Sequence, residues 1–385
     1  MKNFTFHNPT KIVFGQGQIS KLNSLIPAGS KIMITMGGGS IFRNGVYDQV
    51  KRALDGRTWI EFSGIEANPD YDTLMRAVAI ARDNKIDFLL AVGGGSVIDG
   101  TKFIATAINY DGSPWEFILD NSKVCHSIAL GSVLTLPATG SEMNCGAVIS
   151  RRSSGEKLVF QNEDNYPLFS ILDPQVIYSL PKNQVANGIV DTFAHTLEQY
   201  LTVPTSGRDM VMDRFAEGLL STLITLAPEL MADKPSYDAC ANFMLTATMG
   251  LNGFVGMAIE QDWATHMIGH ELTALCGLDH GVTLAIVHPA LMNVMRKEKH
   301  DKIVQYAQRV WGINTGSDEQ KIDAAIAATE KFYRSLGIKT RLTEHGVSKE
   351  IMNEIVERFR SRGASLGERG IVSPDHVAKI LAQAM

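Results

Sequence analysis

One aspartate and four histidines in the second half of the sequence have the types and spacing of metal ligands: Asp191, His195, His266, His270 and His280. Asp191 and His195 are four residues apart, as are His266 and His270, so on a helix each pair would share one face. This mixed set of oxygen and nitrogen ligands suits Zn²⁺ or Fe²⁺ better than Ca²⁺ or Mg²⁺. A carboxylate among the apolar residues of such a helix is costly unless it is paired or bound to a metal. The pattern predicts one divalent metal centre.

Five candidates are more than a catalytic ion needs. Four protein ligands fill a tetrahedral zinc, as in structural sites, whereas a catalytic ion must keep a position open for substrate. Either the ion expands to five ligands when substrate binds, or one candidate lies outside its coordination sphere. Asp262, four residues before His266, could cap the following helix or orient that histidine. The spacing leaves these alternatives open.

A glycine-rich turn, Gly93-Gly94-Gly95-Ser96, follows the apolar run 87–92 and opens a helical stretch that carries Asp99. Glycines allow a backbone to approach a ligand closely, and the first turn of a helix presents unpaired N–H groups to an anion. The turn matches neither the G-x-G-x-x-G fingerprint nor the P-loop, because Thr101 precedes Lys102. It predicts a phosphate or pyrophosphate site, with a plain tight turn as the alternative.

Two further turns follow apolar runs. In NAD-binding α/β domains a carboxylate at such a strand end binds the ribose hydroxyls, but Gly37-Gly38-Gly39-Ser40 has none. A small uncharged turn can accept a 2′-phosphate that a carboxylate would repel, so this segment favours NADP over NAD. The third turn, residues 135–144, offers hydroxyls and amides at a strand end, where ligands of α/β proteins bind.

A dinucleotide site and a Lewis-acid metal together favour one chemistry. The metal can stabilise negative charge on the oxygen of an alcohol or aldehyde while hydride is exchanged with a nicotinamide. Such a reaction needs no catalytic set of serine, tyrosine and lysine. The residues therefore predict a metal-dependent alcohol or aldehyde oxidoreductase.

The apolar pattern changes near residue 180. Before it, short apolar runs alternate with helical stretches, which predicts a parallel sheet covered by helices, with strands at 31–36, 87–92 and 132–136 and a helix at 71–84. Segments 4–6 and 12–14 are predicted to form a separate pair of strands. Beyond residue 180 the pattern predicts helices at 184–201, 208–227, 237–254, 283–297, 323–336 and 349–360, and a last one that opens at Ser373-Pro374. We expect two domains, 1–180 and 181–385.

Composition narrows the class of protein. The 385 residues carry a net charge of −5 and no stripe rich in lysine and arginine, which argues against nucleic acid or an anionic membrane as a partner. The N-terminus lacks an apolar signal segment, and no apolar run is long enough to span a bilayer. Four scattered cysteines suit a reduced, cytoplasmic protein: Cys125, Cys145, Cys240 and Cys276.

Taken together, the motifs resemble those of the group III metal-dependent ("iron-containing") alcohol dehydrogenases. Within that family they resemble the branch of NADP-dependent butanol dehydrogenases and broad-range aldehyde reductases. The resemblance covers nearly the whole chain, and its most specific stretches are Gly93–Asp99, Leu136–Glu142, Val185–His195, Asp262–Leu272 and Gly277–Gly281.

The resemblance implies a dehydroquinate synthase-like architecture. A Rossmann-like α/β domain with a parallel sheet and flanking helices would precede an all-helical domain, with the active site in the cleft between them. The resemblance also implies that the ligands of one Fe²⁺ or Zn²⁺ ion are Asp191, His195, His266 and His280. His270 would then lie beside the metal near the nicotinamide, in a catalytic role that handles a proton.

The same resemblance implies NADP(H) as coenzyme. NAD-using members carry an aspartate that would align near Gly38, which agrees with the charge argument for residues 37–40. The implied coenzyme contacts are Gly94, Gly95, Ser96 and Asp99 at the pyrophosphate, Thr135, Thr139, Ser141 and Asn144 at the nicotinamide side, Lys157 at the ribose, and Asn68 and Pro69 at the adenosine side. Substrates would be short- to medium-chain aldehydes and primary alcohols such as butanal and butanol. Relatives form homodimers, partly through N-terminal strands.

Two other functions are open to residues of these types. A lyase related to dehydroquinate synthase would share the fold and use NAD transiently, but it would need a basic pocket for a phosphate, which is not found near the metal motifs. A metallohydrolase would hold a nucleotide substrate on the glycine turns. A binding role without catalysis is disfavoured, because a buried cluster of charged residues is hard to explain unless it performs chemistry.

Overall fold

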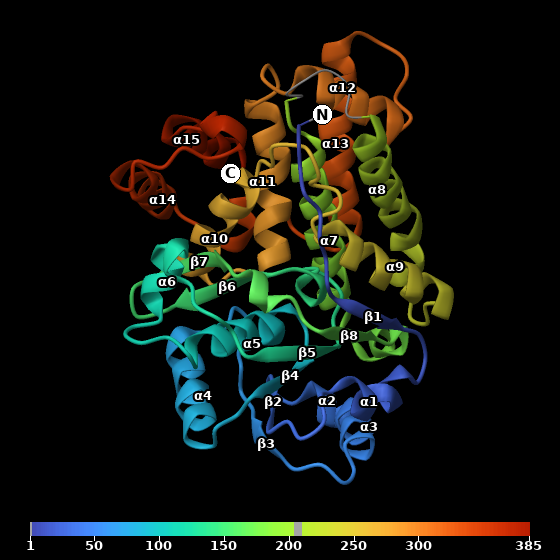
Figure 1. Ribbon diagram of the computed structural model, residues 1–385. Helices are drawn as coiled ribbons and strands as arrows, with labels where there is room; N and C mark the ends of the chain where they lie inside the picture. The colour runs from blue at the N-terminus through green and yellow to red at the C-terminus, as the bar shows by residue number, and fades with distance from the viewer. Residues whose placement is uncertain (1, 204–209) are drawn as a thin grey trace. The chain divides into compact units, whose positions relative to one another are not determined.

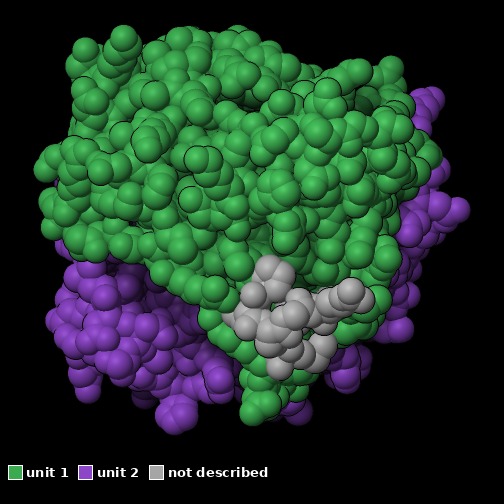
Figure 2. Space-filling model, turned by 90° about the horizontal axis from the view of Figure 1, so that it is seen from above, with its two compact units in different colours: residues 1–6, 182–233, 249–385 green, residues 7–181, 234–248 purple. Residues whose placement is uncertain are grey.

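The computed structural model describes residues 2–203 and 210–385, and the chain divides into two compact units (Figure 1, Figure 2). Unit 2 contains His7–Pro181 and Lys234–Thr248. Unit 1 contains Met1–Phe6, Lys182–Asp233 and Met249–Met385. Each unit thus includes a short segment from the other half of the sequence.

Unit 2 is built on a six-stranded sheet in which all strands are parallel. The strand order is β1-β8-β5-β4-β2-β3. The central strands are fully buried apolar runs, as expected of a parallel sheet that is covered on both faces. The strands are β1 (Lys11–Phe14), β2 (Ile32–Met36), β3 (Trp59–Phe62), β4 (Phe88–Gly93), β5 (Ala129–Leu134) and β8 (Phe169–Leu172).

Helices and one antiparallel hairpin complete unit 2. The helix α5 contacts β4 and β5 and is buried along most of its length. The helices are α1 (Leu22–Leu25), α2 (Ser40–Arg43), α3 (Val46–Ala53), α4 (Tyr71–Asp83), α5 (Gly95–Ala107) and α6 (Trp115–Leu119), and the hairpin pairs β6 (Gly146–Arg151) with β7 (Glu156–Gln161). Most of α9 (Tyr237–Gly250) also belongs to this unit.

The strand order creates a switch point between β2 and β4. From β2 the chain continues outward to β3, whereas from β4 it continues in the opposite direction to β5. In open α/β sheets, ligands bind at the carboxyl ends of the strands that flank such a point. The turns after these two strands are residues 37–40 and 94–96, and the turn after the neighbouring β5 begins at Thr135, whose N–H donates to the carbonyl of Gly93 at 2.9 Å. All three polar turns therefore lie at one edge of the sheet.

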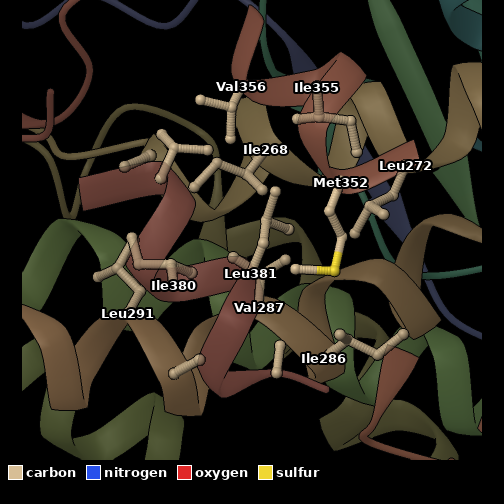
Figure 3. Packing of buried hydrophobic residues seen from close by; sticks show 14 of the residues in the cluster. Ile268, Leu272, Ile286, Val287, Leu291, Met352, Ile355, Val356, Ile380 and Leu381 are labelled. Atoms are coloured by element: carbon tan, nitrogen blue, oxygen red, sulfur yellow. The ribbon is translucent and has the colours of Figure 1, made fainter. Parts of the chain in front are cut away.

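Unit 1 is helical. An apolar cluster joins four of its helices, with Ile268, Val287, Ile355 and Leu381 among its fully buried members (Figure 3). The cluster fixes α10 and α11 against the C-terminal pair α14 and α15. The helices are α7 (Lys182–Tyr200), α8 (Met210–Leu230), α10 (Ala264–Cys276), α11 (His280–Val294), α12 (His300–Arg309), α13 (Asp318–Ser335), α14 (Lys349–Ser361) and α15 (Pro374–Gln383). No helix within residues 2–203 and 210–385 is long and apolar enough to cross a membrane.

The prediction of a separate pair of strands at the N-terminus is wrong. Residues 11–14 do form a strand, but it pairs in parallel with β8 at the edge of the main sheet. Residues 4–6 form no strand and belong to unit 1, where the ring of Phe6 packs edge-on against Phe254 at 6.0 Å between centroids. The alternation Phe-Thr-Phe that suggested a strand instead places an aromatic ring against another part of that unit.

Several helix boundaries also differ from the prediction. The start of the helix predicted at 208–227 lies outside the described part of the chain, and α8 continues to Leu230, beyond the predicted end at Ala227. The helix predicted to reach Phe254 ends at Gly250. The helix predicted from Thr283 begins at His280, which places that candidate ligand in its first turn.

Candidate active site

Four of the five candidate ligands lie together in unit 1. Their ligand atoms are all within 4.8 Å of one another: Asp191, His195, His266 and His280. The Asp191 Oδ1 lies 3.5 Å from His195 Nε2, 3.7 Å from His266 Nε2 and 3.5 Å from His280 Nε2. Ligand atoms about 2.1 Å from one tetrahedral ion would be roughly 3.4 Å apart. The spacing of these atoms therefore fits one small divalent ion.

The fifth candidate, His270, lies beside this group. The centroid of its ring is 5.4 Å from that of His280 and 6.4 Å from that of His266. The two rings that come closest are those of His195 and His266, stacked at 4.5 Å with an angle of 16° between their planes. The four-atom group does not include His270, so its predicted role in proton handling stays a prediction.

Close approach of three helices brings the ligands together. Asp191 and His195 lie on α7, His266 on α10 and His280 at the start of α11. A Cβ at Gly281 would lie 2.7 Å from the backbone oxygen of Asn187 on α7. A Cβ at Gly269 would lie 2.7 Å from the Thr283 hydroxyl, so α10 and α11 also meet at a glycine. Gly281 adjoins His280 and Gly269 lies three residues after His266, so both glycines let the helices approach near the ligands.

A buried carboxylate that the sequence analysis missed holds one of the ligands. Glu198, on α7, accepts a hydrogen bond from His266 Nδ1 and also accepts from the backbone N–H groups of Thr265 at 2.6 Å and His266 at 3.3 Å. Its side chain is 2% exposed. Glu198 follows Asp191 by seven residues and His195 by three, so the three residues form one stripe of the helix. The position of Glu198 on this stripe is the sequence feature that could have identified it.

The electrostatics of the group suit a cation. Burial lowers the pKa of His266, but Glu198 and Asp191 outweigh this effect and raise it to about 9. The buried Nε2 of His266, which faces Asp191, has no hydrogen-bond partner among the described residues. Two buried carboxylates and three clustered imidazoles together fit a divalent metal ion.

Asp262 caps a helix and, among the described residues, is not hydrogen-bonded to the imidazole of His266. Its Oδ1 accepts a hydrogen bond from the N–H of Ala264, the first residue of α10, at 2.7 Å. Its Oδ2 forms an ion pair with the buried Lys299 at 2.5 Å. Glu198 occupies the position at His266 Nδ1 that the alternative interpretation gave to Asp262. Of the two interpretations, the geometry favours the cap.

The glycines of the turn after β4 are needed for packing. A Cβ at Gly95 would lie 2.4 Å from Thr139 Oγ1, and a Cβ at Gly94 would lie 3.1 Å from Leu136 Cβ. The turn after β5 thus rests directly on the turn after β4. The Ser96 hydroxyl accepts from the N–H of Asn68 at 3.2 Å, so the segment Asn68-Pro69 also adjoins this turn. Residues predicted to contact the pyrophosphate and the nicotinamide side are therefore neighbours.

A buried lysine organises the predicted nicotinamide-side residues. Lys102 Nζ donates to Ser141 Oγ at 2.9 Å, to Asn144 Oδ1 at 3.0 Å and to the carbonyl of Gly146 at 2.8 Å. Ser141 in turn donates to Asp99 at 2.6 Å. Burial lowers the pKa of Lys102 to about 8 and raises that of Asp99. The sequence analysis noted Lys102 only for its position in a failed P-loop match.

Lys157 lies in the β6–β7 hairpin, opposite Ser150, and is buried. Its charge acts on Asp99 and lowers the pKa of that carboxyl against the larger effect of burial. The predicted ribose-side lysine is thus close enough to the network of the nicotinamide-side turn to influence it.

Only one of the three glycines after β2 could carry a side chain without strain. Gly39 has φ of 99°, in the left-handed region, and a Cβ at Gly37 would lie 3.2 Å from the carbonyl of Ile65. A Cβ at Gly38 would meet no atom within 4 Å. The resemblance also places the aspartate of NAD-using members near Gly38. The absence of a carboxylate there is thus not imposed by packing.

Known proteins resemble this chain over its full length. Residues 9–174 match the protein family described as "Iron-containing alcohol dehydrogenase". Residues 185–385 match the family described as "Fe-containing alcohol dehydrogenase family, C-terminal". The chain is 51% identical to the NADPH-dependent aldehyde reductase YqhD of Escherichia coli K12, over 97% of each protein. It is 41% identical to NADP-dependent alcohol dehydrogenase 3 of Entamoeba histolytica, over 94% of each.

A solved structure agrees. The crystal structure of E. coli K-12 YqhD superposes with a TM-score of 0.97 at 49% identity and covers 100% of this chain and 99% of that one. These matches confirm the resemblance inferred from the motifs and the predicted fold class, a parallel α/β part followed by a helical part in a dehydroquinate synthase-like fold. The chain therefore belongs to the iron-containing alcohol dehydrogenase family.

Proposed function

We propose that this protein is an NADP(H)- and metal-dependent aldehyde reductase that reduces short- to medium-chain aldehydes such as butanal to primary alcohols. The observation that carries the proposal is the four-residue group around Asp191, which fits one divalent ion. Support for the coenzyme comes from the uncharged turn 37–40 and from two relatives that are named as NADPH- or NADP-dependent. The ion is Fe²⁺ or Zn²⁺, and elemental analysis of protein purified without added metal will distinguish them.

The proposal gives each part of the site a task. A divalent ion held by Asp191, His195, His266 and His280 would supply a Lewis acid that polarises the substrate carbonyl. Asp191 would contribute the negative charge of the ligand set, and Glu198 would hold His266 with Nε2 turned toward Asp191. His270, beside His280, would handle the proton that completes the alcohol.

The metal assignment has a direct test in the ligands. We expect His266→Ala and His280→Ala to lose bound metal and aldehyde-dependent NADPH oxidation together. His376→Ala is a suitable control, because His376 lies in the first turn of α15, where it bonds to Ser373 at the helix N-terminus. Normal aldehyde reduction by either ligand variant would overturn the assignment.

The unit that contains the glycine turns is proposed to bind the coenzyme. The contacts would come from residues 37–40, from the turns after β4 and β5, and from Asp99, Asn68-Pro69 and Lys157. Unit 1 would be the metal-binding domain. These assignments correspond to the predicted domains 1–180 and 181–385, apart from the exchanged segments 1–6 and 234–248.

Coenzyme choice can be tested at the one open glycine. We expect the wild-type enzyme to prefer NADPH over NADH at least tenfold in kcat/KM, which is about 1.4 kcal/mol. Gly38→Asp places a carboxylate near the 2′-phosphate and should abolish this preference by repulsion. Gly38→Asn has nearly the same size without the charge and should keep most of it. Equal kcat/KM for both coenzymes in the wild type, or equal effects of the two substitutions, would refute the argument.

We further propose that the protein works as a homodimer in the cytoplasm, on small-molecule substrates and without nucleic acid or membrane as a partner. Support comes from the net charge of −5 and from four cysteines that are scattered along the sequence without a C-x-x-C motif. Analytical ultracentrifugation of the metal-loaded protein tests the dimer: sedimentation as a monomer at micromolar concentration would contradict it.

A further inference from the structure

The helix α10, which carries His266, receives part of its N-terminal cap from another helix, in addition to the bond from Ala264 N–H to Asp262. The residue that precedes its first turn, Trp263, has φ of 63° and provides no side-chain cap. The second and third N–H groups of the helix, those of Thr265 and His266, donate to Glu198 Oε1 on α7. These are groups that a helix cannot satisfy internally, and a carboxylate there is also favoured by the helix dipole.

The other oxygen of the same carboxylate faces an imidazole. Glu198 Oε2 accepts from His266 Nδ1, which leaves Nε2, the nitrogen that faces Asp191, as the ring atom able to bind an ion. Both oxygens of an ionised carboxylate accept and neither donates, so Nδ1 is the donor in this contact. Both oxygens of Glu198 thus bind the first turn of α10, one through the backbone and one through the ring.

The negative charge of Glu198 also contributes to the charge balance of the proposed metal site. Asp191 supplies one negative charge among the proposed ligands, and Glu198 supplies a second behind His266, while the three imidazoles are neutral when they bind a metal. Two negative charges balance one divalent ion in this buried site. A carboxylate that accepts from a metal-bound histidine also increases the basicity of that ligand.

We propose that Glu198 is a positioning residue of the metal centre. It fixes the tautomer and the orientation of His266 and completes the charge balance of the ion. This inference rests on the proposed metal-dependent function, which it extends by one residue that does not itself bind the ion. A residue with only the capping role would stabilise α10 equally with and without metal.

The substitution Glu198→Gln separates these roles. The Gln side chain keeps one oxygen and replaces the other by an amide that donates, so it can serve either the backbone N–H groups or the His266 ring, but not both as the carboxylate does. Glu198→Ala removes both contacts and is the more severe second variant. Glu217→Gln is the matched control, because Glu217 is a buried carboxylate of the same unit that accepts from Tyr200 and Arg309.

The primary measurement is the affinity of metal-free protein for Zn²⁺, determined by competition with a chromogenic chelator. We expect Glu198→Gln to weaken zinc binding by about 10- to 100-fold, Glu198→Ala to weaken it at least as much, and Glu217→Gln to change it less than about threefold. The second measurement is the rise in melting temperature on addition of zinc. A positioning role predicts a smaller rise in the Glu198 variants, whereas a capping role alone predicts a lower melting temperature with an unchanged rise.

The outcomes distinguish this inference from the proposed function. Wild-type protein that binds no stoichiometric zinc would overturn the metal-dependent function itself. Wild-type protein that binds zinc, together with a Glu198→Gln variant of equal zinc affinity, would overturn the role of Glu198 and leave the function standing. If Glu198→Ala does not fold, the zinc affinity of Glu198→Gln still decides between these results.

Discussion

The contact between α7 and α11 at Gly281 allows a sharp test of how the metal site is built. Gly281 is the second residue of α11 and follows the proposed ligand His280 directly. In Gly281→Ala the new methyl group would lie 2.7 Å from the backbone oxygen of Asn187 and 2.8 Å from its Cα. Backbone atoms cannot move aside as a flexible side chain can, so the two helices must separate.

The size of this separation follows from the distances. Ordinary contacts of a Cβ begin near 3.4 Å, so the start of α11 has to move away from α7 by about 0.7 Å. Metal–ligand distances tolerate only about 0.2 Å of change. We therefore expect zinc affinity to fall at least about tenfold, and the free energy of unfolding of the metal-free protein to fall by about 1–3 kcal/mol, the usual cost of overpacking.

The same substitution elsewhere provides the control. Gly218 lies inside α8, and a Cβ there would meet no atom within 4 Å. Gly218→Ala should raise the free energy of unfolding by roughly 0.4–1 kcal/mol and leave zinc affinity unchanged. Urea denaturation and chelator competition on the two variants measure both quantities. Zinc affinity of Gly281→Ala equal to that of Gly218→Ala would refute the view that the approach of these helices positions His280.

Two further predictions concern unit 2. Burial lowers the pKa of Lys102 from its ordinary value of 10.5 to about 8 in the folded protein. Between pH 8 and pH 10.5 the unfolded chain therefore binds more protons than the folded protein. The contribution of Lys102 to the free energy of unfolding thus rises with pH, by at most about 3 kcal/mol. Urea denaturation from pH 7.5 to 10 should therefore show the stability difference between wild type and Lys102→Met growing with pH, and a constant difference would contradict the burial argument. Gly95→Ala should raise the KM for NADPH at least about tenfold, because the new methyl group lies 2.4 Å from Thr139 Oγ1. Adding Thr139→Ala should restore part of the loss in steady-state assays, and no recovery would show that the glycine is required for another reason.

Much of the fold was readable from the sequence, because the central strands are continuous apolar runs and most helices of unit 1 keep a clear apolar period. The failures have a common cause. Residues 4–6 have the alternation of a strand, yet Phe6 packs against Phe254, a contact that local pattern cannot reveal. The apolar period placed the end of one helix at Ala227, but α8 continues through Pro228 to Leu230.

For the candidate site, too, local sequence features were predictable and contacts between separate elements were not. Residue types and local spacing identified five candidates, Asp191, His195, His266, His270 and His280, and the family resemblance selected all but His270 as ligands. Local spacing could not show that Glu198 reaches across to the start of α10, although this residue lies on the same stripe as Asp191 and His195. Nor could it show that Lys102 binds Ser141 and Asn144, because such contacts depend on how separate elements pack.

The interleaving of the two units along the sequence has a consequence for how the protein is made. Among the described residues, strand β1 pairs with β8 and with no other strand, so the sheet stays incomplete until residue 172 has left the ribosome. Unit 2 also includes Lys234–Thr248, and unit 1 includes Met1–Phe6. Neither unit can reach its final form when the first half of the chain has been synthesised, since contacts between distant parts of a sequence form late. During translation the nascent chain must therefore carry an unfinished, apolar sheet for a long interval, and it is then that we expect aggregation and dependence on chaperones to be greatest.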